Sequence, residues 1–277
     1  MCQVLDVSRS GYYAWRKRKP SVRSIVNEQI SKQIKEIFRV SRQSYGSPRV
    51  TVELQELGWK VSRPRVARLM RKAGLKVKAR RRFIPLTTDS DHGFYLSPNL
   101  LDRSFEVGKI NRAWVSDLTY IHTLEGWLYL TTVMDLGDRR VIGWATSETM
   151  KAEETTIAAL RMAVANRKPA KRTIFHSDRG SQYACRAFRK ELKKQKIKRQ
   201  SMSRKANCWD NAVAESFFKS AKKEWLYQQV FTTRRQAKLA VFEYIESWYN
   251  TRRRHSALQM KSPTQFLLER LLQQKAA

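Results

Sequence analysis

The segment AWVSDLTYIHT, residues 113–123, is dominated by β-branched and aromatic side chains. Two similar runs follow it, GWLYLTTVMDL at residues 126–136 and RRVIGWATS at residues 139–147, each after a short turn, LE and GD. Short runs of such residues bounded by turns favour β-strands over helices. The sequence therefore predicts three consecutive strands in this part of the chain.

The region after these strands alternates between helical and extended patterns. Ile157, Leu160 and Val164 lie on one face of a helix expected over residues 151–167. The segment RTIFHSD (172–178) is almost continuously apolar, which is typical of a strand buried on both faces. The remaining expected elements are a helix over 181–195, a short strand in RQSMS (199–203) and a long helix from about Asn211. The order β-β-β-α-β-α-β-α predicts an α/β fold over residues 112–277, with a mixed five-stranded sheet flanked by helices.

Residues 1–75 show helical periodicity and precede this sheet. Apolar residues at helical spacing form two stripes on either side of the turn-forming segment YGSPRV (45–50). The stripes consist of Ile30, Ile34 and Ile37, and then of Val50, Leu54 and Leu57. A third helix is expected to begin at Ser62 and to end at Gly74. The pattern predicts an all-α domain.

The third helix is rich in arginine. Val66, Met70 and Ala73 share its apolar side, and the cations remain for the outside. The arginines are Arg63, Arg65, Arg68 and Arg71. A helix, a tight turn and an arginine-rich helix are typical of a helix-turn-helix, whose last helix enters the major groove of DNA. The alternative is a basic helix face that is only solvated.

Residues 76–111 lack regular periodicity and are predicted to form a basic, extended linker. The segment KVKARRRF (76–83) is followed by a stretch rich in Pro, Gly, Asp and Ser. Its cations are candidates for contacts along a phosphate backbone, although charge runs of this kind are often solvated tethers. The candidates are Lys78, Arg80, Arg81 and Arg82.

The charge balance limits the class of partner. The chain of 277 residues has 56 Lys and Arg against 24 Asp and Glu, a formal net charge of +32. Nucleic acid is the usual partner of so basic a protein, and an anionic membrane is the rival. No apolar run is long enough to span a bilayer and no signal-peptide core is visible, so we expect no membrane partner and a cytoplasmic location. The cysteines Cys2, Cys185 and Cys208 form no CxxC pair, so they indicate neither a disulfide frame nor a zinc ribbon.

Three acids stand out in this basic chain. Asp117 lies inside the first strand, Asp178 ends the fourth strand, and Glu215 lies on the last helix. Each acid has a structural alternative: an ion pair with an arginine for Asp117, a helix cap for Asp178, and a pair with Lys219 for Glu215. The element order instead allows all three to meet at the carboxyl end of the sheet. Three such carboxylates would suit two Mg²⁺ ions in phosphodiester chemistry.

Several long motifs occur in an order that resembles the integrase-type transposases of bacterial insertion sequences. The motifs are YGSPRV, WVSDLTYI, HSDRGSQY, SMSRKANCWDNAVAESFFKS, YNTRRRHSAL and SPTQF. In that family two overlapping reading frames make a fused enzyme, and this chain resembles the second-frame product. The spacing between Asp178 and Glu215 is one residue longer than is usual in the family, and the leucine-zipper segment of the first frame is not visible.

The resemblance implies a ribonuclease H-like core and an Asp-Asp-Glu triad formed by Asp117, Asp178 and Glu215. It also implies that the same residues bind Mg²⁺ or Mn²⁺, as two ions. It implies binding to the terminal inverted repeats of the element, 3′-end cleavage, and strand transfer by a copy-out, paste-in route. It further implies a homo-oligomer on double-stranded DNA, a possible first-frame partner or fusion, and a nucleoid-associated bacterial protein.

Other residues are candidates for DNA contacts or for structural roles. Lys219 and Lys222 follow Glu215 on one helix face, where they would meet a phosphate or remain solvated. The consecutive Arg252, Arg253 and Arg254 would grip phosphates. His176 is more often a core residue than a ligand, and the turn setting of Asp135 favours a structural role. Asp210 and Asn211 are expected to cap the last helix.

Two rival functions remain open at this point. One is a non-catalytic helix-turn-helix regulator with a degenerate nuclease core, which would bind DNA equally well. The other is a ribonuclease H-like nuclease that hydrolyses DNA without joining it. Substitution of the three acids separates the first rival from an enzyme, and the presence of joined products separates the second.

Overall fold

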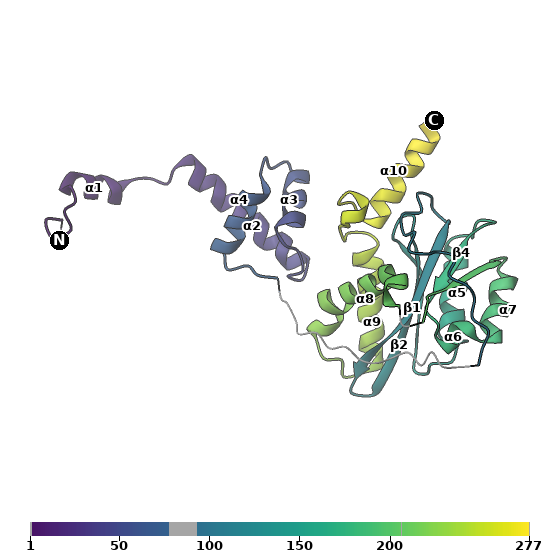
Figure 1. The fold of residues 1–277 in the computed structure, drawn as a ribbon. Coiled ribbons are helices and arrows are strands. Elements are labelled where there is room, and N and C mark those ends of the chain that lie inside the picture. Colours follow the sequence, from purple (N-terminus) through teal and green to yellow (C-terminus); the bar gives the residue numbers. More distant parts are fainter. Residues whose placement is uncertain (1, 78–92, 206, 277) are drawn as a thin grey trace. The chain divides into compact units, whose positions relative to one another are not determined.

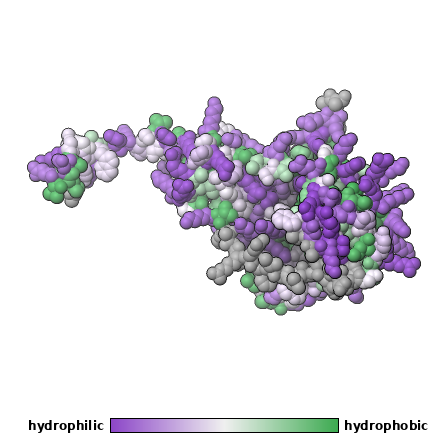
Figure 2. All heavy atoms as spheres, viewed as in Figure 1, coloured by the Kyte–Doolittle hydropathy of each residue, from purple (hydrophilic) through white to green (hydrophobic). Residues whose placement is uncertain are grey.

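The computed structural model describes residues 2–77, 93–205 and 207–276, which form two compact units divided after Lys78 (Figure 1). The cations Arg80, Arg81, Arg82 and Lys78, which were expected to follow DNA, lie outside the described residues. Exposed side chains on the visible face are mostly hydrophilic, in keeping with the charge of the chain (Figure 2). Within the described ranges, no helix is both long and apolar enough to cross a membrane.

The first unit is all α, as its periodicity predicts. Its helices are α1 (Arg9–Lys17), α2 (Val22–Val40), α3 (Ser47–Glu56) and α4 (Arg63–Lys72). The last three pack together, whereas α1 buries none of its residues. Gly58 and Gly74 follow α3 and α4 with positive φ, and each allows the chain to leave a helix in the left-handed conformation. The buried stripe of α2 is Ile30, Ile34 and Phe38, so the prediction of Ile37 as its third member is wrong by one position.

The second unit contains a five-stranded sheet in the order β3-β2-β1-β4-β5. Its strands are β1 (Ala113–Thr123), β2 (Gly126–Asp135), β3 (Val141–Ser147), β4 (Ile174–Ser177) and β5 (Arg199–Met202). The first three pair antiparallel, and β4 and β5 join them in parallel. The predicted mixed sheet is confirmed, and β4 is buried at every position.

Helices cover both faces of the sheet (Figure 1). On one face, α5 (Thr156–Asn166) packs on β2 and β3. A Cβ atom at Gly143 would lie 2.3 Å from the carbonyl oxygen of Ala159, so this close approach requires glycine. The predicted helix over 181–195 is divided at Cys185 into α6 (Ser181–Ala184) and α7 (Arg186–Lys194).

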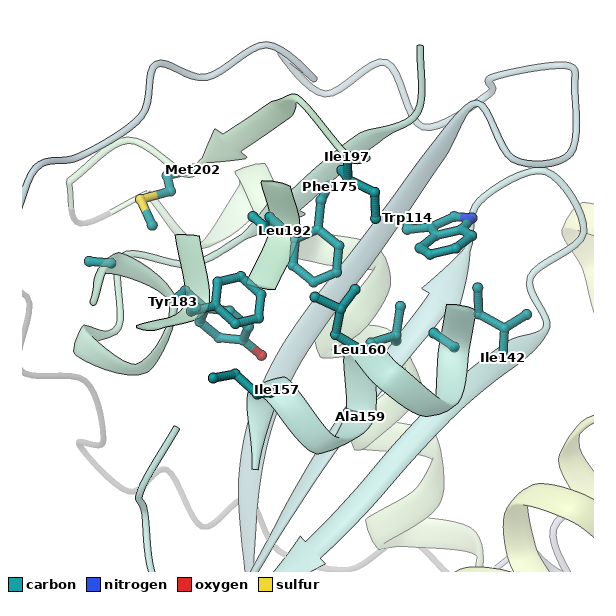
Figure 3. Close-up of a cluster of buried hydrophobic side chains, with 14 residues drawn as sticks. Trp114, Ile142, Ile157, Ala159, Leu160, Phe175, Tyr183, Leu192, Ile197 and Met202 are labelled. Carbon is teal, nitrogen blue, oxygen red and sulfur yellow. The ribbon is translucent and has the colours of Figure 1, made fainter. Parts of the chain in front are cut away.

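The core under these helices is a single apolar cluster (Figure 3). Trp114 and Phe175 contribute from neighbouring strands, and Leu160 and Phe188 close over them from α5 and α7. The rings of Phe175 and Phe188 have centroids 5.4 Å apart. The strand positions whose side chains matter for function are therefore fixed by a rigid, fully buried layer.

The other face carries the carboxyl-terminal elements. The helix predicted from about Asn211 is α8 (Ala212–Glu224), which packs on β1, and α9 (Arg234–Phe242) packs on β1 and β2. Shorter elements connect or follow these helices. They are the 3₁₀ turns η1 (Cys208–Asn211), η2 (Leu226–Gln228) and η4 (Ser256–Leu258), the π-helical segment η3 (Glu243–Tyr249) and the helix α10 (Pro263–Ala276).

Residues 93–111 belong to the second unit, which differs from the extended linker predicted over 76–111. Leu101 is 3% exposed, and Leu96 packs against the apolar cluster. The backbone N–H of Leu100 donates to Oγ of Ser201 at 2.8 Å. The apolar residues of this stretch follow neither a helical nor a strand period, so the sequence pattern did not reveal its packing.

Candidate active site

Asp117 and Asp178 come from adjacent parallel strands. The pairing of β1 with β4 places Val115 opposite His176, and each aspartate is two residues farther along its own segment. Neighbouring strands lie about 4.8 Å apart, so this alignment brings both carboxylates to one level of the sheet, where β4 ends. The sheet order places β4 directly beside β1, as a meeting of these two acids requires.

Each aspartate is oriented by the backbone that follows it. Oδ1 of Asp117 accepts a hydrogen bond from the N–H of Leu118 at 2.8 Å, and Oδ1 of Asp178 accepts one from the N–H of Gly180 at 3.0 Å. A Cβ atom at residue 180 would lie 3.1 Å from that Oδ1 atom, so glycine leaves room for the carboxylate to turn back. Both aspartates are half-buried, which leaves part of each carboxylate accessible.

Glu215 lies in the first turn of α8 and is exposed. The start of this helix is tied to β1, because Nδ2 of Asn211 donates to the carbonyl oxygen of Ser116 at 3.3 Å. Ser116 immediately precedes Asp117. The contact therefore holds the helix that carries the third acid against the strand that carries the first.

The charges of the three acids act on one another. Burial raises the pKa of Asp117 well above its usual value, and the negative charges of Asp178 and Glu215 raise it further. Burial also raises the pKa of Glu215, and the charge of Asp178 adds to this effect. The three carboxylates singled out in the sequence thus share one electrostatic neighbourhood. Among the side chains that the structure describes, no group of three or more His, Cys, Asp or Glu residues is arranged so that it could hold a metal ion.

The segment before α8 is anchored by a buried aspartate. The side chain of Asp210 is 0% exposed and accepts hydrogen bonds from Nη2 of Arg204 at 2.7 Å and from Nε of Arg103 at 3.0 Å. Hydrogen bonds from Arg204 hold its pKa far below the usual range. Asp210 was expected to cap α8, but the structure places it in this network, and Asn211 occupies the cap position without a side-chain cap bond.

Two of these anchors escaped the sequence analysis. Arg103 lies in the stretch assigned to a linker, and Arg204 lies inside the motif SMSRKANCWDNAVAESFFKS, where no role was predicted for it. Both belong to a network that spans about a hundred residues of sequence, from Asn99, whose Nδ2 donates to Asp210, to the start of α8. The only hint in the sequence was the acid in CWDN, Asp210. A solvent-exposed acid would have the same local sequence, so its burial could not be predicted.

Comparison with known proteins places this site in a family. An HTH-like domain model matches residues 26–83, and two integrase core domain models match residues 109–208 and 196–263. A 31 kDa protein of insertion element IS600 from Shigella sonnei is 43% identical over 96% of this chain and 97% of that protein. Transposase InsF of insertion sequence IS3A from Escherichia coli (strain K12) is 42% identical over 96% of this chain and 92% of that protein.

The chain belongs to the IS3 family of insertion-sequence transposases. The transposase has a ribonuclease H-like integrase core preceded by a helix-turn-helix region, as the sequence predicts. Among solved structures, the HTLV-2 integrase catalytic core domain in complex with magnesium (trimeric form) aligns over 56% of this chain and 95% of that chain, with a TM-score of 0.43 and 15% identity.

The two lysines after Glu215 differ in their surroundings. Lys219 is exposed, whereas Lys222 is half-buried on the transposase's α8 helix. Burial lowers the pKa of Lys222, and the charge of Asp117 opposes this shift. Lys222 therefore lies within electrostatic reach of the triad, and Lys219 remains available on the surface.

The arginine run 252–254 corrects the sequence prediction in part. Arg253 is 5% exposed, and its Nε and Nη2 atoms donate to Glu224 at 2.7 Å each. Arg254 is 4% exposed and donates from Nη1 to the carbonyl oxygen of Met260 at 3.1 Å. Buried guanidinium groups that already bind the protein do not reach DNA, so the predicted phosphate contacts are unsupported for these two residues. Arg252 is exposed.

The α4 arginines also fall into two groups. Arg63, Arg68 and Arg71 are exposed along the helix. Arg65 is half-buried, and its Nε and Nη2 atoms donate to Oδ1 of Asn27 at 3.0 and 2.8 Å. Three of the four arginines predicted to contact DNA are therefore exposed to solvent. The fourth, Arg65, also holds α4 against α2.

Two polar residues near the triad have structural surroundings. His176 is 0% exposed between the hydroxyl groups of Ser201 and Ser203, and burial lowers its pKa to about 4. Asp135 is likewise 0% exposed and accepts a hydrogen bond from Nη1 of Arg167 at 2.7 Å. The structural interpretation of both residues is supported by these contacts.

Proposed function

We propose that this transposase is a divalent-metal-dependent DNA strand-transferase in which Asp117, Asp178 and Glu215 are the catalytic residues. It would cleave the 3′ ends of its insertion sequence and join them to another strand. The supporting observation is the register of β1 and β4, which aligns Asp117 with Asp178, in a chain of net charge +32. In keeping with this, the charge of Asp178 raises the pKa of both Asp117 and Glu215.

The donor chemistry of these residues fits Mg²⁺ or Mn²⁺. Hard divalent cations prefer carboxylate oxygen, and neutralisation of three neighbouring acids would relieve the repulsion between them. Glu215 is exposed on the first turn of α8, so its side chain is free to move toward the two aspartates. When bound, two ions supply Lewis-acid stabilisation of the attacking and leaving oxygens of a phosphodiester.

The remaining functions divide between the two units. In our proposal the exposed face of α4 binds the terminal inverted repeats through Arg63, Arg68 and Arg71, with the fourth arginine, Arg65, held partly by Asn27. Lys222, Lys219 and Arg252 contact phosphates near the triad. The transposase acts as a homo-oligomer on double-stranded DNA in the nucleoid, with a first-frame partner or fusion, by a copy-out, paste-in route.

The test uses DNA that carries an end of the element, with Mg²⁺ or Mn²⁺. We expect Asp117→Asn, Asp178→Asn and Glu215→Gln each to lower cleavage and joining by about a thousandfold or more, because each removes a metal ligand. End binding measured by gel shift should stay within about twofold. The matched control is Glu153→Gln, which changes an exposed glutamate on the same unit and should leave activity unchanged.

Three outcomes would overturn the proposal. Full activity in any of the three variants would remove that residue from the catalytic set, and the absence of activity in the parent protein would favour a non-catalytic DNA-binding regulator. Cleaved DNA without joined products would instead indicate a nuclease that only hydrolyses. The assay should therefore score both products in the same reaction.

A further inference from the structure

The ammonium group of Lys222 lies between two tyrosine rings. Its Nζ atom is 5.3 Å from the ring centroid of Tyr120 and 5.8 Å from that of Tyr227. Both distances are within the range of about 6 Å over which an aromatic ring attracts a cation. The two rings belong to different elements, since Tyr120 lies on β1 and Tyr227 on η2. We name these three residues the lysine cage.

The rings of the cage are themselves held in place. Tyr120 is half-buried and meets the ring of Trp127 on β2 edge to face, with centroids 5.0 Å apart. Trp127 in turn meets His122 at 5.1 Å. Tyr227 is half-buried in η2, which packs on α8. A lysine held only by solvent would sample many rotamers, whereas this one faces two restrained rings.

The cage lies beside the catalytic acids. Tyr120 is three residues after Asp117 on β1, and Lys222 is seven residues after Glu215 on α8. The charges of Lys222 and Asp117 act on each other. A flexible lysine next to an acid cluster would tend to pair with a carboxylate and so lose its use to a substrate phosphate. An aromatic ring attracts the cation without neutralising its charge.

We propose that Tyr120 and Tyr227 are positioning residues that hold the Lys222 ammonium ready for a DNA phosphate next to the catalytic acids. This inference rests on the proposed strand-transfer function. The rings supply attraction without charge neutralisation and fix a side chain whose displacement by about 1 Å would be costly to catalysis. The tyrosine hydroxyls have no part in the role, because the attraction comes from the ring face.

The test compares phenylalanine with leucine at each tyrosine. Tyr120→Leu and Tyr227→Leu should each lower kcat/KM for strand transfer about tenfold, equivalent to about 1.4 kcal/mol, with most of the loss in kcat. Tyr120→Phe and Tyr227→Phe keep the ring face and should stay within about twofold of the parent. The control is Tyr95→Leu, which removes a contact with Arg189 at 5.6 Å elsewhere in the same unit and should leave activity unchanged.

A double-mutant cycle separates positioning from general support of the fold. In a Lys222→Ala background the leucine substitutions should cause no further loss, because the side chain that they position is gone. Additive losses would overturn the proposal, as would leucine variants with parental activity or phenylalanine variants as impaired as leucine variants. Thermal melts of every variant check that the compared proteins are equally folded.

A second measurement does not require catalysis. If Lys222 contacts a phosphate, its loss should reduce the slope of log binding constant against log salt concentration by about 0.9. Tyr120→Leu should reduce the slope in the same way, and Tyr95→Leu should not. An inactive parent protein would refute the proposed function, whereas an unchanged slope in Tyr120→Leu would refute the lysine cage.

Discussion

The segment before α8 and the edge formed by β1 and β4 shift the pKa of a carboxylate in opposite directions. Asp210 has a pKa far below its usual range because Arg204 donates hydrogen bonds to it. Asp117 has a pKa well above its usual range because it is buried beside other acids. In a chain with 56 Lys and Arg, an arginine beside Asp117 would satisfy its charge but would occupy the oxygens that a metal ion needs.

The same contrast occurs within one helix. Glu224 at the end of α8 is buried and binds Arg253, whereas Glu215 at its start is exposed and feels the charge of Asp178. One glutamate therefore stabilises the fold, and the other is the one that the proposed function assigns to a metal ion. Substitutions of charged residues in both units test this contrast between paired and unpaired groups.

Replacement of Glu224 by alanine should have the largest effect on stability. It leaves the Arg253 guanidinium, whose side chain is 6% exposed, without its carboxylate partner. Removal of one member of a buried pair typically costs about 3 to 5 kcal/mol. We expect that loss in the free energy of unfolding, measured by urea titration. Glu215→Ala, on the same helix, should change stability by less than about 1 kcal/mol while it abolishes activity.

A small loss of stability in Glu224→Ala would show that the fold does not depend on the ion pair between Glu224 and Arg253. It would then contradict the contrast between Glu224 and Glu215. Restoration of stability by Glu224→Leu combined with Arg253→Met would sharpen it, because an apolar pair of similar volume often matches a buried ion pair.

Replacement of Asp210 by asparagine should have the second largest effect. It removes the charge that accepts hydrogen bonds from Arg204 and Arg103. Hydrogen bonds to charged groups contribute about 1.5 to 3 kcal/mol, so we expect a loss of about 2 to 3 kcal/mol by urea titration. Joining activity should also fall at temperatures where the variant is folded, because α8 loses the anchor of its first turn.

Asp102→Asn is the matched control for Asp210. Its side chain is 73% exposed, and it meets the same Arg204 at 3.3 Å. We expect a change within about 0.5 kcal/mol, as for most exposed ion pairs. Equal losses in the two variants would mean that burial does not distinguish these acids.

The strands were predictable from sequence for physical reasons, and the assignment of the three acids as catalytic residues stays a prediction. β-branched and aromatic runs mark β1 to β3, and the apolar run that ends at Asp178 marks β4. An acid such as Asp117 inside an apolar strand is conspicuous, because burial of an unpaired charge is costly. The long motifs that resemble insertion-sequence transposases supplied the family, which the comparisons confirm.

The network around Asp210 and the burial of Arg253 were not predictable in the same way. Both depend on contacts between residues far apart in sequence, such as Arg103 with Asp210 and Arg253 with Glu224. An arginine run has the same composition whether it is solvated or buried. The break at Cys185 was also missed, because the apolar spacing continues through it.

Asp117→Asn should raise the free energy of unfolding of the metal-free protein, whereas Asp210→Asn should lower it. The folded-state pKa of Asp117 is raised, so the parent loses stability as pH rises through that value. Asparagine has no such loss, and we expect a gain of about 1 kcal/mol at pH 8 with EDTA and a smaller gain at pH 5. For Asp210 the pKa is lowered, so the stability that it contributes is lost as pH falls.

Thermal melts from pH 5 to pH 8 in EDTA measure this difference. Destabilisation by Asp117→Asn at every pH would mean that its carboxylate is satisfied by the protein, as that of Asp210 is. Addition of Mg²⁺ should stabilise the parent and have less effect on the variant, since only the parent retains all three acids.

The last comparison lies in the first unit, where arginines divide into exposed and hydrogen-bonded residues as the acids do in the second unit. Arg68 is exposed on α4, whereas Arg65 donates two hydrogen bonds to Asn27. Arg68→Ala should weaken binding to end DNA by about 1 kcal/mol without loss of stability, which is the effect of one lost contact. Arg65→Ala should lower both binding and stability.

Asn27→Ala removes the same hydrogen bonds and keeps the cation, so it should lower stability and preserve most of the binding. If Asn27→Ala weakens end binding as much as Arg65→Ala does, Arg65 acts by orienting α4 and not by touching DNA.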